Sequence, residues 1–174
     1  MTWEDSKAWS DRFLPEIKMI LGRRFISEPA VEEDALRNTD LIVFKMEAIR
    51  IACRIRKPEY YEKYGDQFTI RSERPSGMET ELAKIVRGWG DYFFYGFGGK
   101  RRLADWRIGD LDVFRLWFHL ETVRLGREPG VLQKNRDGSS DFRGFRWDEL
   151  PKDFVIERMD ARYLDAIRQL ELDA

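Results

Sequence analysis

Apolar side chains recur along this chain first with a helical period and then with a strand period. Across residues 3–24 they return at helical spacing, which predicts an amphipathic N-terminal helix with a kink near Pro15. An apolar run at about 41–46 and an alternating segment at about 48–56 predict two strands joined by a tight turn. The pattern therefore predicts a helix that covers one face of a sheet.

Three arginines share one face of the second predicted strand. Arg50, Arg54 and Arg56 alternate with apolar residues that are expected to face the core, Cys53 among them. Because an unpaired buried guanidinium costs several kcal/mol, these side chains need anions. Two sources stay open: the phosphates of a nucleic acid, or an internal network of protein carboxylates. The candidate carboxylates are Glu79, Glu81 and Asp40.

The rest of the pattern predicts further helices and strands. Ser76 and Glu79 have the spacing of a capping box, which predicts a helix from about 78 to 88. Asp110 and Gly126 are expected to begin and end another helix. Further strands are expected at 67–71, 91–97, 103–108 and 142–147, and a closing helix at 161–172. The fold class is therefore α/β (α+β), with a central mixed sheet of about 4–6 strands flanked by helices.

The composition narrows the class of protein. A chain of 174 residues with 43% hydrophobic content can bury one core, so a single domain over residues 1–174 is expected. No segment approaches the roughly 20 apolar residues of a membrane span, and the first residues lack a signal-peptide pattern. A soluble, cytoplasmic protein is therefore expected. One cysteine and one histidine are too few for a structural zinc site, so any metal would be held by carboxylates.

Charge is distributed unevenly along the chain. The net charge is −1 overall, but residues 45–107 carry +5, whereas 1–44 and 108–174 each carry −3. Arginine outnumbers lysine by 22 to 9, and the planar guanidinium suits phosphate better than an ammonium does. The middle of the chain is therefore the candidate surface for an anionic partner, with ordinary surface ion pairs as the alternative.

A tyrosine-rich connection follows the arginine strand. Tyr60, Tyr61 and Tyr64 lie beside Lys57 and Lys63, a combination that can stack on unpaired bases. Packing of the same tyrosines against the sheet is the alternative.

Four segments give the chain a recognisable order of elements. They are Thr39–Phe44, Arg54–Arg56, Glu81 with Lys84, and Gly90–Gly96. In this order the chain resembles the PD-(D/E)XK nuclease superfamily, in particular its compact members similar to Holliday junction resolvases. The resemblance covers roughly residues 10–120. It implies a restriction-endonuclease-like core at about 10–125, with a C-terminal extension at about 126–174.

The resemblance also implies a chemistry. Such nucleases hydrolyse phosphodiesters with a divalent cation that carboxylates hold beside a lysine. Asp40 stands where the family has its motif aspartate, but Arg54 and Arg56 stand where it has an acid and a lysine, and arginine cannot ligate a cation. Glu81 and Lys84, three residues apart on one helix face, could replace them. The implied catalytic residues are thus Asp40, Glu81 and Lys84, with Asp40 and Glu81 as ligands of Mg²⁺ or Mn²⁺. Further candidate carboxylates are Glu33 and Glu47.

Two functions of different classes follow. One is a metal-dependent DNA endonuclease acting on duplex or branched DNA, of a kind encoded by phages or mobile elements. The other is a catalytically inactive nuclease-fold protein that binds nucleic acid or a protein partner, as an accessory, defence or counter-defence factor. The resemblance also implies a homodimer. The residues expected to contact nucleic acid are Arg50, Arg54, Arg56, Arg71 and Arg74.

Overall fold

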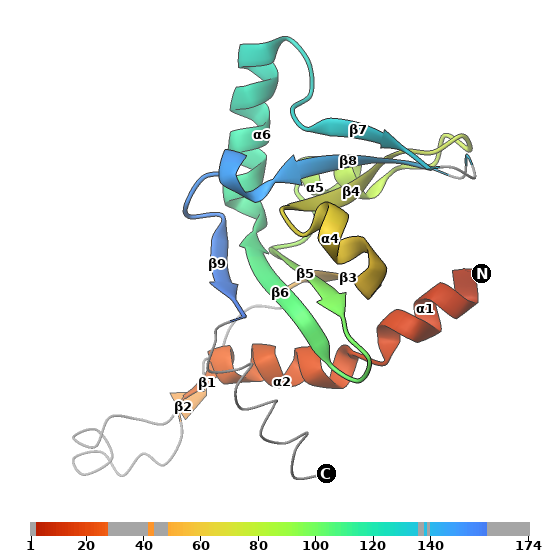
Figure 1. Ribbon diagram of the computed structural model, residues 1–174. Coiled ribbons are helices and arrows are strands. Elements are labelled where there is room, and N and C mark those ends of the chain that lie inside the picture. The colour runs from red at the N-terminus through yellow and green to blue at the C-terminus, as the bar shows by residue number, and fades with distance from the viewer. Residues whose placement is uncertain (1–2, 28–41, 44–48, 136–137, 139, 160–174) are drawn as a thin grey trace.

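The computed structural model describes residues 3–27, 42–43, 49–135, 138 and 140–159 (Figure 1). A mixed four-stranded sheet lies between a pair of N-terminal helices on one face and a second, three-stranded sheet on the other (Figure 1). The α/β class predicted from the sequence is confirmed. None of the described helices is long and apolar enough to cross a membrane.

The four-stranded sheet is built around an aromatic strand. Its strands, in spatial order, are β3 (Ile51–Arg56), β5 (Tyr92–Gly98), β6 (Leu103–Asp110) and β9 (Val155–Arg158). β3 runs parallel to β5, and the other neighbours are antiparallel. In β5, Phe93, Tyr95 and Phe97 face one side and Phe94 faces the other, and all four are at most 1% exposed. β5 lies between β3 and β6 and buries both faces, and β3 is left at one edge of the sheet as far as the described residues go.

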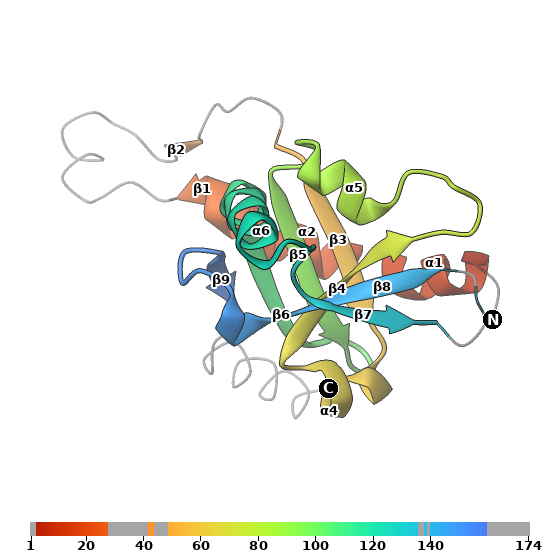
Figure 2. The ribbon, with the colours of Figure 1, turned by 90° about the horizontal axis from the view of Figure 1, so that it is seen from above.

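The three-stranded sheet crosses over the first one when seen from above (Figure 2). It is antiparallel, and its strands, in spatial order, are β4 (Gln67–Glu73), β8 (Asp141–Arg146) and β7 (Val131–Lys134). The connection from β3 to β5 supplies β4 and three short helices, η1 (Pro58–Tyr60), α4 (Tyr61–Tyr64) and α5 (Glu81–Val86). A further short helix, η2 (Trp147–Glu149), follows β8. These strands confirm the segments predicted at 67–71, 91–97, 103–108 and 142–147.

Two apolar clusters hold the layers together. The larger lies between the two sheets and helices α5 and α6, where α6 is Leu111–Leu125. Its aromatic residues are Phe68, Phe93, Tyr95, Phe97, Phe114, Phe118, Phe145 and Phe154. The smaller cluster packs α2 (Leu14–Phe25) against the opposite face of the four-stranded sheet, through residues such as Phe13, Ile17 and Trp106. The four-stranded sheet is therefore buried on both faces.

The N-terminal segment forms two helices where the sequence predicted one kinked helix. α1 (Trp3–Asp11) ends before Phe13, which is 1% exposed, and α2 begins at Leu14. Pro15 is the second residue of α2, where its missing N–H needs no helical acceptor. The chain therefore breaks just before the proline and not at it.

The sequence predicted the caps of helix α6 correctly and the N-terminal cap of helix α5 wrongly. Asp110 caps α6 as predicted, because its carboxylate accepts hydrogen bonds from the N–H groups of Asp112 (2.8 Å) and Val113 (3.2 Å). Gly126 follows that helix with a left-handed φ of 64°. The capping box predicted at Ser76 is wrong: α5 begins at Glu81, and the hydroxyl of Thr80 accepts from the N–H of Ala83 (3.2 Å).

The hairpin predicted between 41–46 and 48–56 is also wrong for the described residues. The short strand β2 (Ile42–Val43) pairs antiparallel with β1 (Ile26–Ser27), whereas β3 pairs with β5. β3 begins at Ile51, so Arg50 precedes the strand. The helix predicted at 161–172 lies outside the described residues.

Candidate functional site

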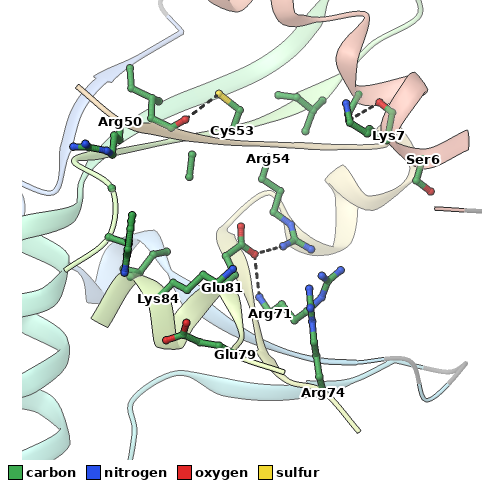
Figure 3. A pocket seen from close by; sticks show the side chains of 17 residues that line it. Ser6, Lys7, Arg50, Cys53, Arg54, Arg71, Arg74, Glu79, Glu81 and Lys84 are labelled. Carbon is green, nitrogen blue, oxygen red and sulfur yellow. Dashed lines mark hydrogen bonds and ion pairs between the residues drawn. The ribbon is translucent and has the colours of Figure 1, made fainter. Parts of the chain in front are cut away.

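A basic pocket of about 640 Å³ opens beside the edge strand β3, with α5 facing that strand and α1 at one end (Figure 3). Consecutive residues from Arg50 to Ile55 line it, so the pocket runs along the strand. Two acidic side chains, Glu79 and Glu81, line it as well. The basic residues that line it are Lys7, Arg50, Arg54, Arg71, Arg74 and Lys84.

Arg54 and Glu81 join the two walls of this pocket. The Arg54 guanidinium reaches from β3 to the Glu81 carboxylate on α5 with an N–O distance of 2.8 Å (Figure 3). The same carboxylate oxygen accepts from the backbone N–H of Arg71 at 3.4 Å. The side chains of Arg54 and Glu81 are 20% and 31% exposed, so the pair is partly shielded from water. The sequence left two kinds of anion open for Arg54, nucleic-acid phosphates or protein carboxylates. In the structure its partner is the carboxylate of Glu81.

Arg71 and Arg74 add positive charge that this carboxylate does not balance. Burial, and after it the charges of Arg54 and Arg74, lower the pKa of the Arg71 guanidinium, while Glu81 raises it. The Nε of Arg71 is buried and has no hydrogen-bond partner among the described residues. Figure 3 shows Arg74 pointing upward beside Arg71. Three guanidinium groups thus converge around one carboxylate.

Phe142 on β8 supports two of these guanidinium groups. The Cζ atoms of Arg54 and Arg71 lie 4.7 Å and 5.6 Å from the centre of its ring. Arg71 and Phe142 are directly opposite each other in the β4–β8 ladder. A cation that lies over an aromatic face is stabilised by the quadrupole of the ring. The ring therefore fixes where the two charges lie.

Arg56 does not line this pocket but lines another one of about 650 Å³, together with Phe142. Its guanidinium donates to the Thr69 hydroxyl (2.6 Å), and its Cζ lies 4.6 Å from the ring centre of Tyr60 and 5.3 Å from that of Tyr64. Arg56 is therefore held by a hydroxyl and two rings, and Tyr60 and Tyr64 pack around this arginine.

The remaining expected residues take different places. Lys84 lines the pocket from α5 and is exposed. Arg50 lines the pocket too and is exposed, and its backbone N–H donates to the Asp91 carboxylate (2.6 Å). Asp40, Glu33 and Glu47 lie outside the described residues.

The described residues of the pocket do not fit the divalent cation that the resemblance implies. Glu81 is paired with Arg54, and Glu79 is paired with Arg87 at 2.6 Å. Among the residues that the structure describes, no three His, Cys, Asp or Glu side chains form a group that could hold a metal ion. A carboxylate that neutralises a guanidinium is a poor ligand for a second cation. Chemistry through a metal therefore has no support from the described part of the site.

Cys53 corrects an expectation about the pocket wall. It was expected in the core, but it lines the pocket and is exposed. Partial removal of its thiol from water still raises its pKa. Its strand neighbours Ile51 and Ile55 pack against the smaller apolar cluster, as the alternation predicted. Cys53 is exposed because β3 is an edge strand whose outer side opens into the pocket.

Sequence reasoning missed Phe142 and Trp89. Phe142 was assigned to a strand, but the pattern does not reveal which strand lies beside it. Trp89 lines the pocket and is 63% exposed, and no part of the sequence pattern marked it as a site residue. Its flanking glycines, Gly88 and Gly90, were the available signal, since both have positive φ (100° and 81°) and mark a sharp turn.

Comparison of the chain with protein-family models, curated proteins and solved structures finds no match.

Proposed function

We propose that this protein binds nucleic acid through the basic pocket, whose arginines take the backbone phosphates. The observation that carries the proposal is the convergence of Arg54, Arg71 and Arg74 around the single carboxylate of Glu81. Guanidinium groups so placed repel one another, and an anion with several oxygens relieves that repulsion. A phosphodiester supplies such oxygens in a linear array, which suits a pocket that runs along a strand.

Binding to single-stranded, duplex and four-way-junction DNA tests the proposal. Fluorescence anisotropy with labelled oligonucleotides should give a Kd that weakens steeply as the salt concentration rises. Arg74→Gln should weaken binding to all sequences alike. It should also reduce the magnitude of the slope of log K against log salt by about 0.7–0.9, which corresponds to the loss of one phosphate contact. Arg71→Gln removes a second guanidinium of the same cluster and should weaken binding in the same way.

A matched control separates the pocket from general charge. Arg124→Gln removes the same charge from α6, where Arg124 pairs with Glu121, and should leave the Kd unchanged. Thermal melting shows whether each variant is folded. Equal losses in the Arg74 and Arg124 variants would contradict the proposal, and so would an absence of binding to every oligonucleotide at low salt.

Metal-dependent cleavage by Asp40, Glu81 and Lys84 stays a prediction. It is tested by incubating the same DNA substrates with Mg²⁺, with Mn²⁺ or with a chelator, beside an Asp40→Ala variant. The binding proposal expects intact DNA and a Kd that the chelator does not change. Cleavage that is lost with the chelator and with the variant would establish the endonuclease instead.

A further inference from the structure

Trp89 is more exposed than any other tryptophan among the described residues with assigned burial. Its exposed fraction is 63%, whereas Trp106 is 4% exposed. The other three, Trp9, Trp117 and Trp147, are each half-buried. An indole is a large apolar surface, and leaving it in water forgoes the stabilisation that its burial would give. A single exposed apolar residue is ordinary in itself, so the surroundings of Trp89 decide its meaning.

The backbone that carries Trp89 is held in place by hydrogen bonds. Its N–H donates to the carbonyl of Lys84 (3.0 Å), and Arg115 donates to the carbonyl of Trp89 (2.9 Å). Arg115 also donates to the carbonyls of Ile85 (2.7 Å) and Gly90. One side chain of α6 thus ties together the end of α5 and the turn that follows it. The indole therefore projects from a fixed turn, which lowers the entropy lost when a ligand binds.

The ring of Trp89 is open to a planar ligand. No aromatic ring or cation of the described chain lies against it. Tyr60 differs, because the guanidinium of Arg56 lies 4.6 Å from its ring centre. Trp89 also lines the basic pocket together with Lys84 and Arg50. The open indole and the guanidinium cluster are therefore parts of one site.

We infer that Trp89 is the stacking platform for an unpaired base of a nucleic acid whose phosphates lie in the basic pocket. The inference rests on the proposed function and names its substrate class, a single-stranded segment. In a duplex both faces of each inner base are already stacked on neighbouring bases, whereas an unpaired base offers a free face to an aromatic side chain. Stacking is tolerant of base identity, so the preference is for strandedness and not for sequence.

The experiment measures fluorescence anisotropy on the full chain with four labelled probes of equal length. These are single-stranded DNA, the same strand in a duplex, the same sequence as RNA, and a strand of abasic sugar phosphates. Trp89→Ala should weaken binding to single-stranded DNA by about 5- to 150-fold. It should leave the Kd for the duplex and for the abasic strand unchanged, since neither presents a free base.

Two control variants accompany it. Trp89→Phe keeps an aromatic face and should retain most of the affinity for the single strand. Leu120→Ala truncates another exposed apolar residue, 57% exposed on α6, and should change no Kd. Because Trp89 is exposed, its truncation should leave thermal melting close to that of the parent chain. The DNA and RNA arms identify which backbone the pocket prefers, and the indole should contribute to both.

The outcomes separate this inference from the proposed function. Equal affinity of Trp89→Ala and the parent chain for single-stranded probes would overturn the inference, while a loss in Arg74→Gln would leave the proposed function standing. An equal loss of affinity for the abasic strand would also overturn it, since the change would then not concern bases. Failure of the parent chain to bind any probe would overturn both.

Discussion

The guanidinium of Arg54 and the carboxylate of Glu81 form a 2.8 Å ion pair that links the edge strand β3 to helix α5 across the basic pocket. This pair assigns Glu81 to neutralising arginine in a site where positive charge is in excess. The endonuclease hypothesis assigns the same carboxylate to a metal ion. The two assignments predict opposite results when the carboxylate is removed.

Glu81→Gln should therefore strengthen the binding of nucleic acid. The change keeps the shape of the side chain but removes the one charge that balances Arg54 and Arg71. Because the pair is partly exposed, its worth is at most about 1 kcal/mol, so the Kd should fall by up to about 5-fold. Anisotropy at low salt measures the effect. Glu121→Gln on α6 is the control with an unchanged Kd, and weaker binding in Glu81→Gln would count against the proposal.

Thr80→Ala should destabilise the protein by about 1 kcal/mol, within a range of about 0.5–2 kcal/mol. The Thr80 side chain accepts from the N–H of Ala83 at the start of α5, and alanine would leave that group without its cap. Urea denaturation measures the change. Ser76→Ala is the matched control, because the capping-box hypothesis places the same role there. Should the two variants lose stability equally, the structural assignment of the cap would be wrong.

The position of this cap could not be predicted from the local sequence alone. Ser76 and Thr80 both offer a hydroxyl near the start of the helix, and the sequence alone favours Ser76 because Glu79 follows it. Gly77 has a φ of 67°, which no helical turn accepts, so the helix begins after it. The caps of α6 were predictable because Asp110 directly precedes the apolar helical pattern and Gly126 directly follows it.

Strand positions were more predictable than strand partners. The aromatic run of β5 and the glycines that follow it predict a strand and a hairpin turn from neighbouring residues alone. The pairing of β3 with β5 joins segments that are separated by β4 and three short helices, and nothing in the alternation of β3 selects it over a hairpin with the preceding segment. The candidate site shows the same contrast: its residues could be predicted from the sequence, but their contacts could not. Arg54, Arg71 and Arg74 were predicted to contact nucleic acid, but the contact that Arg54 and Arg71 share with Phe142 depends on how β8 packs.

Phe142→Leu should weaken nucleic-acid binding and lower stability together. Leucine keeps an apolar side chain on β8 but removes the ring over which Arg54 and Arg71 lie. Each cation–π contact is worth about 0.5–1 kcal/mol, so the free energy of unfolding should fall by about 1–2 kcal/mol. Thermal or urea unfolding and anisotropy measure both effects. Phe142→Tyr keeps the ring and should retain both properties, whereas a loss as large as that in the leucine variant would mean that the ring is not the cause.

Cys53 should react slowly with iodoacetamide at neutral pH. Its raised pKa means that at any pH below that value the folded chain holds less thiolate than an unshifted thiol would, and the thiolate is the reacting form. The rate should therefore keep rising with pH after the rate for the urea-unfolded chain has levelled off. Because the chain has one cysteine, mass spectrometry follows this site alone.

The same reaction reports on occupancy of the pocket. Cys53 lines the pocket beside Arg54, so a bound oligonucleotide should slow its alkylation further, and high salt should reverse the protection. The Arg74→Gln variant should need more oligonucleotide for equal protection. An alkylation rate that saturating oligonucleotide leaves unchanged would mean that nucleic acid binds on another face. In the pH experiment on the chain without oligonucleotide, an alkylation rate that levels off at or below the ordinary cysteine pKa would show that water reaches the thiol freely.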